Sequence, residues 1–235
     1  SDSYAIVPDY YNGIVPKVVA KVGEKVKAGS VLMIDKNRPE IKFVSPVSGE
    51  VTAVNRGEKR KVLSVVVKPE AQIEYEDFGK KNVASLKREE VKEAILHAGM
   101  WPFIKQRPYD IVASPADEPR DIFVSAFYSA PLAPNFDFVV KGQEVDFQTG
   151  LDALAKLTDG KVYVGIRKGS SVSVKGVETV EVEGPHPAAN VGVQINHIKP
   201  INKGEVVWTV NPADVIVIGR LFNKGIADFS RLVVL

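Results

Sequence analysis

Two residue patterns divide this chain, and each pattern is typical of a different fold. Up to about residue 68, short runs rich in Val and Ile are separated by Gly and Pro. Closely spaced runs of this kind predict an all-β sandwich or barrel. The predicted strands are residues 18–20, 31–34, 41–44 and 62–67. We therefore expect a β domain over residues 1–70, followed by a polar connector over residues 71–84.

A helix is predicted directly after the connector. Apolar residues recur at helical spacing from Val91 to Ala98, Ser85 is a suitable N-cap, and Gly99 stands where a left-handed C-terminal cap belongs. This helix opens the second part of the chain, residues 85–235.

Predicted strands and helices alternate in the second part. Pro212 falls in the first turn of the last helix and Gly225 just past its end, which is the usual placement of these two residues. Alternation of this kind predicts a parallel sheet covered by helices, a small Rossmann-like α/β domain. The strands are expected at residues 121–126, 161–166 and 177–182, and the helices at 147–157, 188–198 and 212–222.

Composition excludes several function classes. The chain has no cysteine, so it holds no disulfide, thiolate nucleophile or cysteine-ligated cluster. Its formal net charge of +2 is spread along the sequence and is not a nucleic-acid signature. Aliphatic runs such as Val215–Ile218 are far too short to span a membrane. We also expect a truncated chain, because the strand-like run 231–235 has no terminator after it.

Residues 22–32 and 45–51 resemble the barrel-sandwich hybrid of biotinyl and lipoyl carrier domains. Gly23, Gly29 and Gly49 fall at its turns, where positive φ is needed. In carriers a modified lysine stands at the tip of the hairpin between the two motifs. Here the nearest lysine, Lys36, lies before the tip at residues 37–40, so we interpret it as a solvated lysine and not as a prosthetic-group carrier.

A second set of motifs extends over almost the whole chain, at residues 43–54, 56–60, 99–109, 116–119, 129–133, 184–188, 207–211 and 214–222. With these motifs the chain resembles a family, the A subunits of bacterial sodium-translocating NADH:quinone oxidoreductases. More distant similarity extends to the C subunit of the Rnf complex and to the flavin-carrying, NADH-binding subunit of complex I. In those relatives a glycine-rich loop lets backbone amides approach the flavin phosphate. In this chain the corresponding loop carries bulky residues and two prolines, so we expect no bound FMN and no hydride transfer.

The resemblance implies a peripheral protein of a membrane complex, located on the cytoplasmic face of the bacterial inner membrane. Its complex would oxidise NADH, reduce quinone and export sodium, with FMN, FAD, riboflavin and an iron–sulfur cluster held by partner subunits B to F. The chain alone is expected to be non-catalytic and to bind no cofactor or metal. The resemblance also implies a β-grasp domain beyond Leu235.

Four residues are candidate contacts to quinone or to a partner: Trp101, Phe103, His186 and Trp208. A quinone ring needs apolar faces and one or two donors, although core packing is the commoner use of buried aromatics. His186 lies in a proline-rich loop before a predicted helix, where polar ligands are favoured. The three histidines are too dispersed to form a metal site.

Two alternative functions stay open at this point. The first is electron input through a bound flavin or NADH, as in the Rnf complex or complex I. The absence of cysteine and the bulky loop argue against it. The second is the carrier function at Lys36, which the position of that residue disfavours.

Overall fold

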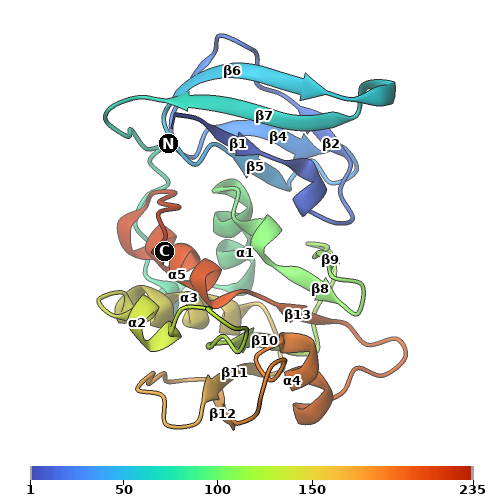
Figure 1. Cartoon of the computed structure of the whole chain (residues 1–235), viewed down its shortest axis with the longest axis vertical. Coiled ribbons are helices and arrows are strands. Elements are labelled where there is room, and N and C mark those ends of the chain that lie inside the picture. Colours follow the sequence, from blue (N-terminus) through green and yellow to red (C-terminus); the bar gives the residue numbers. More distant parts are fainter. Residues whose placement is uncertain (1, 234–235) are drawn as a thin grey trace.

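The computed structural model describes residues 2–233 and contains a β domain stacked on an α/β domain (Figure 1). The β domain consists of two antiparallel sheets, ordered β1-β7-β6-β3 and β2-β4-β5. Between them lies a small core of Val, Leu and Ala side chains. This arrangement confirms the predicted barrel-sandwich fold. Its strands are β1 (Tyr4–Ile6), β2 (Pro16–Val18), β3 (Lys25–Val26), β4 (Val31–Asp35), β5 (Lys42–Val44), β6 (Gly49–Arg56) and β7 (Val62–Pro69).

The α/β domain is built on one mixed sheet, ordered β12-β11-β10-β13-β8-β9. The first four strands in that order run parallel, and β8 and β9 add an antiparallel edge. This confirms the predicted α/β layer. The strands are β8 (Lys105–Arg107), β9 (Ile111–Val112), β10 (Ile122–Ser125), β11 (Val162–Arg167), β12 (Glu178–Val182) and β13 (Val207–Thr209).

Helices cover both faces of this sheet. On one face, α1, α3 and α5 share the main core with alternate residues of β10 and β11. On the other face, α4 packs on Phe123 and Val207. The helices are α1 (Arg88–His97), α2 (Phe136–Val140), α3 (Glu144–Lys156), α4 (Val191–Ile198) and α5 (Pro212–Lys224).

The two domains share one continuous core. Met33 and Phe43 of the β domain belong to the same buried cluster as Met100 and Trp101 of the α/β domain. The backbone at Gly99 also lies close against the β domain, because a Cβ there would overlap the side chain of Val44. The contact between the domains is therefore an internal packing surface that resembles a domain core.

The connector is bound along both domains. Tyr75 forms a bridge with Ala28 of the β domain, and Asp77 forms one with Ile226 after α5. The N–H of Lys81 donates to the carbonyl of Phe222. Residues with the composition of a polar linker thus contribute to the attachment of one domain to the other.

Several predicted boundaries were wrong. Ser85 is not the N-cap of α1, because it lies in a separate 3₁₀ turn, Val83–Ser85, and the carboxylate of Glu90 accepts the N–H of Lys87 instead. Helix α4 begins at Val191 and not at residue 188, since residues 188–190 continue the turn that follows Pro187. The first predicted strand is shifted to Pro16–Val18.

The end of the chain also differs from the prediction. Residues 231–233 form no strand, and the last two residues of the predicted run lie outside the described residues. By contrast, the predicted start of α5 and its glycine cap are confirmed, although the helix runs two residues beyond the predicted end at 222, to Lys224. Pro212 occupies its first turn, and Gly225 caps it in the left-handed conformation, with φ 74°.

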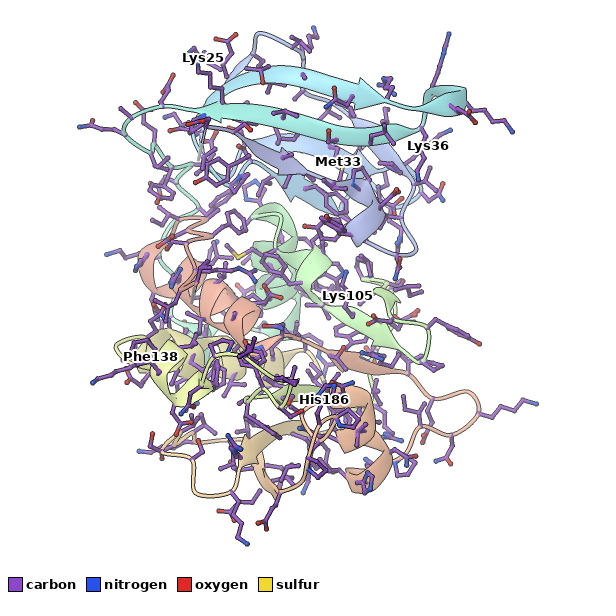
Figure 2. All side chains as sticks on the ribbon, viewed as in Figure 1. Lys25, Met33, Lys36, Lys105, Phe138 and His186 are labelled. Carbon is purple, nitrogen blue, oxygen red and sulfur yellow. The ribbon has the colours of Figure 1, made fainter. Side chains whose placement is uncertain are left out.

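The hairpin tip that follows β4 is fixed to the second domain. The Arg38 guanidinium donates to the carboxylate of Asp35 at 2.8 Å and to the carbonyls of Val112 and Gly13 at 3.2 and 2.9 Å. Lys36 is exposed beside this anchored tip (Figure 2). A carrier lysine stands at the hairpin tip itself, whereas Lys36 lies before it, and the Arg38 side chain ties the tip to the carbonyl of Val112 in the α/β domain.

Candidate functional site

The main cavity of the α/β domain lies where the order of its parallel strands reverses. The chain leaves β10 toward β11 and β12 on one side, and returns through α4 to β13 on the other side. In open α/β sheets, ligands bind at the carboxyl ends of the strands at such a switch point. A cavity of about 660 Å³ occupies that position, with Ser125 at the end of β10 and Val210 following β13.

Four parts of the chain form the walls of this cavity, one of them the segment 209–214 between β13 and α5. Phe103, Lys105 and Arg107 come from the segment that ends in β8, and Phe127 and Tyr128 come from the loop after β10. The last wall consists of residues 189–193 at the amino end of α4. The cavity thus has aromatic and cationic sides brought together from distant parts of the sequence.

Two cationic nitrogens at the cavity are buried without a hydrogen bond to any described residue, namely Nζ of Lys105 and Nε of Arg107. Lys105 Nζ lies 4.9 Å from the centre of the Tyr11 ring, a cation–π contact. Arg107 Nε lies 3.3 Å from Oδ1 of Asp110, close enough for an ion pair. Burial lowers the pKa of Lys105, because the charged ammonium loses hydration.

Two carboxylates line the cavity, that of Asp110 and that of Asp214 in the first turn of α5. The buried carboxylate of Asp214 accepts a hydrogen bond from the Arg231 guanidinium. Burial raises the pKa of Asp214, and the charges of Arg231 and Lys105 oppose that effect. Burial, with the charge of Asp214, also raises the pKa of Tyr128.

A second cavity of about 420 Å³ adjoins the first and shares Phe127 and Tyr128 with it. His186 lines it, with Nδ1 hydrogen-bonded to Oγ of Ser129 at 3.1 Å. The same Oγ accepts the N–H of Ala189 at 3.0 Å. Figure 2 labels Lys105 and His186, one in each of the two adjoining cavities.

The structure does not bring the four predicted contact residues together. Trp101 and Trp208 are buried in the core, with rings 5.4 Å apart in an edge-to-face arrangement. Trp101 Nε1 donates to the carbonyl of Ala113 at 2.8 Å. Neither tryptophan lines either of the two cavities, whereas Phe103 lines the main cavity and His186 its neighbour.

A smaller cleft lies between the two domains on the other side of Phe103. Its volume is about 160 Å³, and its walls are mostly apolar, including Phe43, Pro102 and Phe229. Tyr11 and Arg231 supply the polar groups. Phe103 therefore separates an apolar cleft from a cavity that contains cations.

Both domains match known protein families. Residues 1–70 match the NqrA N-terminal barrel-sandwich hybrid domain, and residues 86–227 match the NqrA second alpha/beta domain. The chain belongs to the NqrA family. It is 38% identical, over 98% of its length, to the A subunit of the Na(+)-translocating NADH-quinone reductase of Neisseria meningitidis serogroup A and to that of Hahella chejuensis. The corresponding protein of Yersinia pestis is 36% identical over the same share. In each case the chain spans 53% of the relative's length.

The described part of this NqrA chain contains neither a membrane helix nor a metal cluster. Among residues 2–233, no helix combines the length and apolar character needed to cross a membrane. Within the same range, no three His, Asp or Glu side chains are grouped to hold a metal ion.

The NqrA segment at the place of the flavin loop does not fit a flavin phosphate. A phosphate-binding loop needs several backbone N–H groups that point toward the ligand. Here the N–H groups of Gly99, Met100, Phe103 and Ile104 donate to backbone carbonyls of the same segment or of α1. Pro102 has no N–H, and bulky side chains flank it on both sides. The loop therefore lacks both the array of free donors and the open backbone that the flavin phosphate requires.

Sequence reasoning missed the charged members of the site. The sequence indicated Lys105 and Arg107 only as bulky residues of the segment 99–109. It indicated Asp214 only as part of the predicted helix 212–222. The alternation of Lys105 and Arg107 along one strand was a usable signal, because residues i and i+2 of a strand share a face. The signal for Asp214 was its place in the first turn of a helix that follows a strand.

Proposed function

We propose that this chain forms part of a peripheral protein within a sodium-translocating NADH-quinone reductase. The observation that supports this proposal most strongly is the likeness of both domains, over 98% of the chain, to the A subunit of that enzyme. The chain would dock at the cytoplasmic face of the membrane on subunits B to F. FMN, FAD, riboflavin and the iron–sulfur cluster would reside in those partners, so this chain contributes contacts and not electron transfer.

Two observations support the proposal that the chain binds no cofactor. The chain has no cysteine to ligate a cluster. The segment from Gly99 to Ile104 directs four of its backbone donors to carbonyls of the chain itself. The alternative of electron input through a bound flavin or NADH requires those donors.

Co-purification tests in one experiment both the docking on membrane partners and the absence of a bound cofactor. The protein, tagged and recovered from mild detergent extracts of the cells that produce it, is expected to bring integral-membrane flavoproteins with it. After dissociation from those partners it is expected to show no visible flavin absorbance. Recovery of a single water-soluble protein with one flavin per chain would instead establish the electron-input alternative.

A second candidate function is contact with quinone in the cleft between the domains. Phe103 supplies an aromatic face there, and Tyr11 and Arg231 supply donors for the ring carbonyls. The cleft volume of about 160 Å³ suits one ring, since a cavity of about 150 Å³ holds a benzene molecule. Of the sequence-predicted contacts, Phe103 thus keeps this role, whereas the buried tryptophans have none in it.

Photo-crosslinking tests the quinone contact. A short-chain quinone that carries an azide is expected to label peptides that contain Phe103 or Arg231. Because the ring would lose its aromatic face, Phe103→Ala should lower the labelling about tenfold, the loss that accompanies removal of one good aromatic contact. Phe138→Ala, an exposed phenylalanine on α2, is the matched control and should leave labelling unchanged (Figure 2). Equal labelling of the parent chain and of both variants would contradict the proposed quinone contact.

A further inference from the structure

We propose that the main cavity at the switch point binds a phosphate monoester of the nucleoside monophosphate class, held by Lys105, Arg107 and the amino end of α4. This function is separate from assembly with membrane partners, because it uses residues of this chain alone. It also differs from flavin binding through a glycine-rich loop, since the corresponding segment directs its N–H groups to the chain's own carbonyls.

Lys105 and Arg107 bring more positive charge to the cavity than their neighbours neutralise. The buried Nζ of Lys105 makes no hydrogen bond to the described residues, and among those residues the buried Nε of Arg107 has only an ion-pair contact, with the carboxylate of Asp110 at 3.3 Å. Buried polar nitrogens are nearly always hydrogen-bonded, so the Lys105 ammonium above all calls for an acceptor that is not part of the chain. A phosphate offers several acceptor oxygens and a double charge, which suits a lysine and an arginine together.

The amino end of α4 adds positive potential at the same place. No backbone carbonyl among residues 2–233 accepts the N–H groups of Val191 and Gly192, and Asn190 makes no side-chain cap. A Cβ on Gly192 would lie 3.8 Å from Nη1 of Arg107, so the guanidinium stands directly at this helix end. A cation at the positive end of a helix is unfavourable by itself, and an anion between them removes the repulsion.

The carboxylates at the cavity do not cancel this potential. Asp214 is paired with Arg231, whose guanidinium donates to it. Asp110 is half exposed and lies 3.3 Å from Arg107 at the wall of the cavity. Asp110 is therefore the one carboxylate of the cavity lining left to balance two cations and two backbone N–H groups.

The volume of the cavity and its apolar wall indicate a ligand larger than a free anion. Its volume of about 660 Å³ lies in the range of small-molecule sites and greatly exceeds the needs of one phosphate. Phe103, Phe127 and Tyr128 line the remainder and offer flat faces to a ring. A ring joined to a phosphate, as in a nucleoside monophosphate, matches both the cationic side and the aromatic side of the cavity.

Isothermal titration of the whole purified chain with AMP, adenosine and inorganic phosphate tests the proposal. AMP is expected to bind, with adenosine and phosphate each at least about tenfold weaker, because each lacks one set of contacts. Arg107→Ala should weaken AMP binding about tenfold to a hundredfold, the effect of losing a charge-assisted hydrogen bond. Arg56→Ala, at the exposed β6–β7 hairpin, is the matched control and should leave AMP affinity unchanged.

Asp110→Asn provides a test that does not depend on a damaged fold. Removal of the carboxylate that competes for Arg107 should strengthen AMP binding severalfold. No AMP binding up to about 1 mM would overturn the site, as would equal losses in Arg107→Ala and Arg56→Ala. Inorganic phosphate that binds as tightly as AMP would overturn the ring assignment. FMN that binds with one flavin per chain would contradict the cofactor-free function, and its sensitivity to Arg107→Ala would still support the anion site.

Discussion

Gly219→Ala is expected to destabilise the fold by about 3 kcal/mol or more, the upper range for overpacking a well-packed core. Gly219 of α5 and Gly150 of α3 lie at the crossing of these helices, where each faces a backbone carbonyl of the partner. A Cβ on Gly219 would overlap the carbonyl oxygen of Asp146, and one on Gly150 would overlap that of Val215. Backbone cannot move aside as a flexible side chain can, so the helices would have to separate.

Separation of the helices would also break the polar contacts beside the crossing. Asn223 donates to Oδ1 of Asp146 at 2.7 Å, and Thr149 donates to Oδ1 of Asn223 at 3.2 Å. Urea unfolding followed by circular dichroism measures the loss as a lower transition midpoint.

Gly192→Ala is the matched control for the Gly219 substitution. Gly192 is also helical, but a Cβ there meets nothing closer than 3.8 Å. Its effect on the free energy of unfolding should stay within about 1 kcal/mol and can be stabilising, since Ala favours helix. Similar midpoints for the two variants would show that α3 and α5 do not cross as closely as described.

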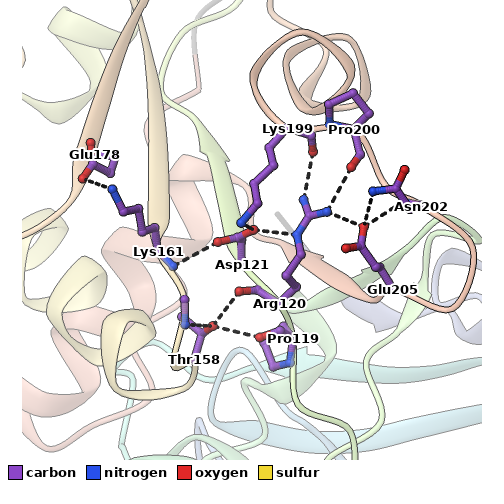
Figure 3. A network of polar contacts seen from close by, with 11 residues as sticks. Pro119, Arg120, Asp121, Thr158, Lys161, Glu178, Lys199, Pro200, Asn202 and Glu205 are labelled. Carbon is purple, nitrogen blue, oxygen red and sulfur yellow. Dashed lines mark hydrogen bonds and ion pairs between the residues drawn. The ribbon is translucent and has the colours of Figure 1, made fainter.

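Asp121→Ala is expected to cost about 3–5 kcal/mol, the range for breaking a buried ion pair. Asp121 is fully buried directly before β10. One of its carboxylate oxygens accepts hydrogen bonds from Nε of Arg120 and from Nζ of Lys199, each at 2.7 Å (Figure 3). Its other oxygen accepts the N–H of Lys161 at 3.1 Å. Removal of the carboxylate leaves a largely buried guanidinium with only Glu205 as an anionic partner among the described residues. Urea unfolding measures this loss as well.

The exposed pair Asp9–Lys61 provides the control for Asp121. Its atoms approach as closely, at 2.7 Å, but both side chains are more than half exposed to solvent. Asp9→Ala should therefore cost less than about 1 kcal/mol. Equal costs at the two positions would contradict the role assigned to burial.

The stability that Asp121 provides should depend on pH in one direction. Burial alone would raise the pKa of this carboxyl, but the hydrogen bonds from Lys199, Lys161 and Arg120 together lower it below its ordinary value. The stabilisation is then fully present above the unfolded pKa of about 3.9 and is lost as pH falls through the folded pKa. Asp121→Asn, which cannot ionise, should lose less stability than the parent chain over that acidic range.

Local sequence patterns were sufficient for the order of the elements and for some of their ends. Gly225 ends α5 because it adopts positive φ at little cost, and Pro212 opens it because the first turn needs no N–H donor. The prediction for Ser85 was wrong because any small polar residue before a helix resembles an N-cap. The choice of cap depends on where the connector turns, and the packing of Val83 in the core decides that.

The site depended on contacts that no local pattern contains. Sequence placed Trp101 and Trp208 among the candidate contacts, because an aromatic residue near a loop can face a ligand or the core. The fold pairs the two rings, although they lie far apart in the sequence, and buries both. Arg107 meets the amino end of α4, and Lys105 lines the same cavity, only because β8 joins the sheet beside β13.

The sequence by itself determined a cysteine-free chain with a Gly- and Pro-punctuated β domain and an alternating α/β domain. These properties follow from composition and from periodicity over a few residues. The tertiary structure alone decided that Met33 and Phe43 share a core with Trp101. It also decided that Lys105 and Arg107 bring nitrogens to a cavity at the switch point that are buried without a hydrogen bond to the described residues. The physical reason is that burial, desolvation and charge pairing depend on neighbours in space, which strand order and domain packing fix.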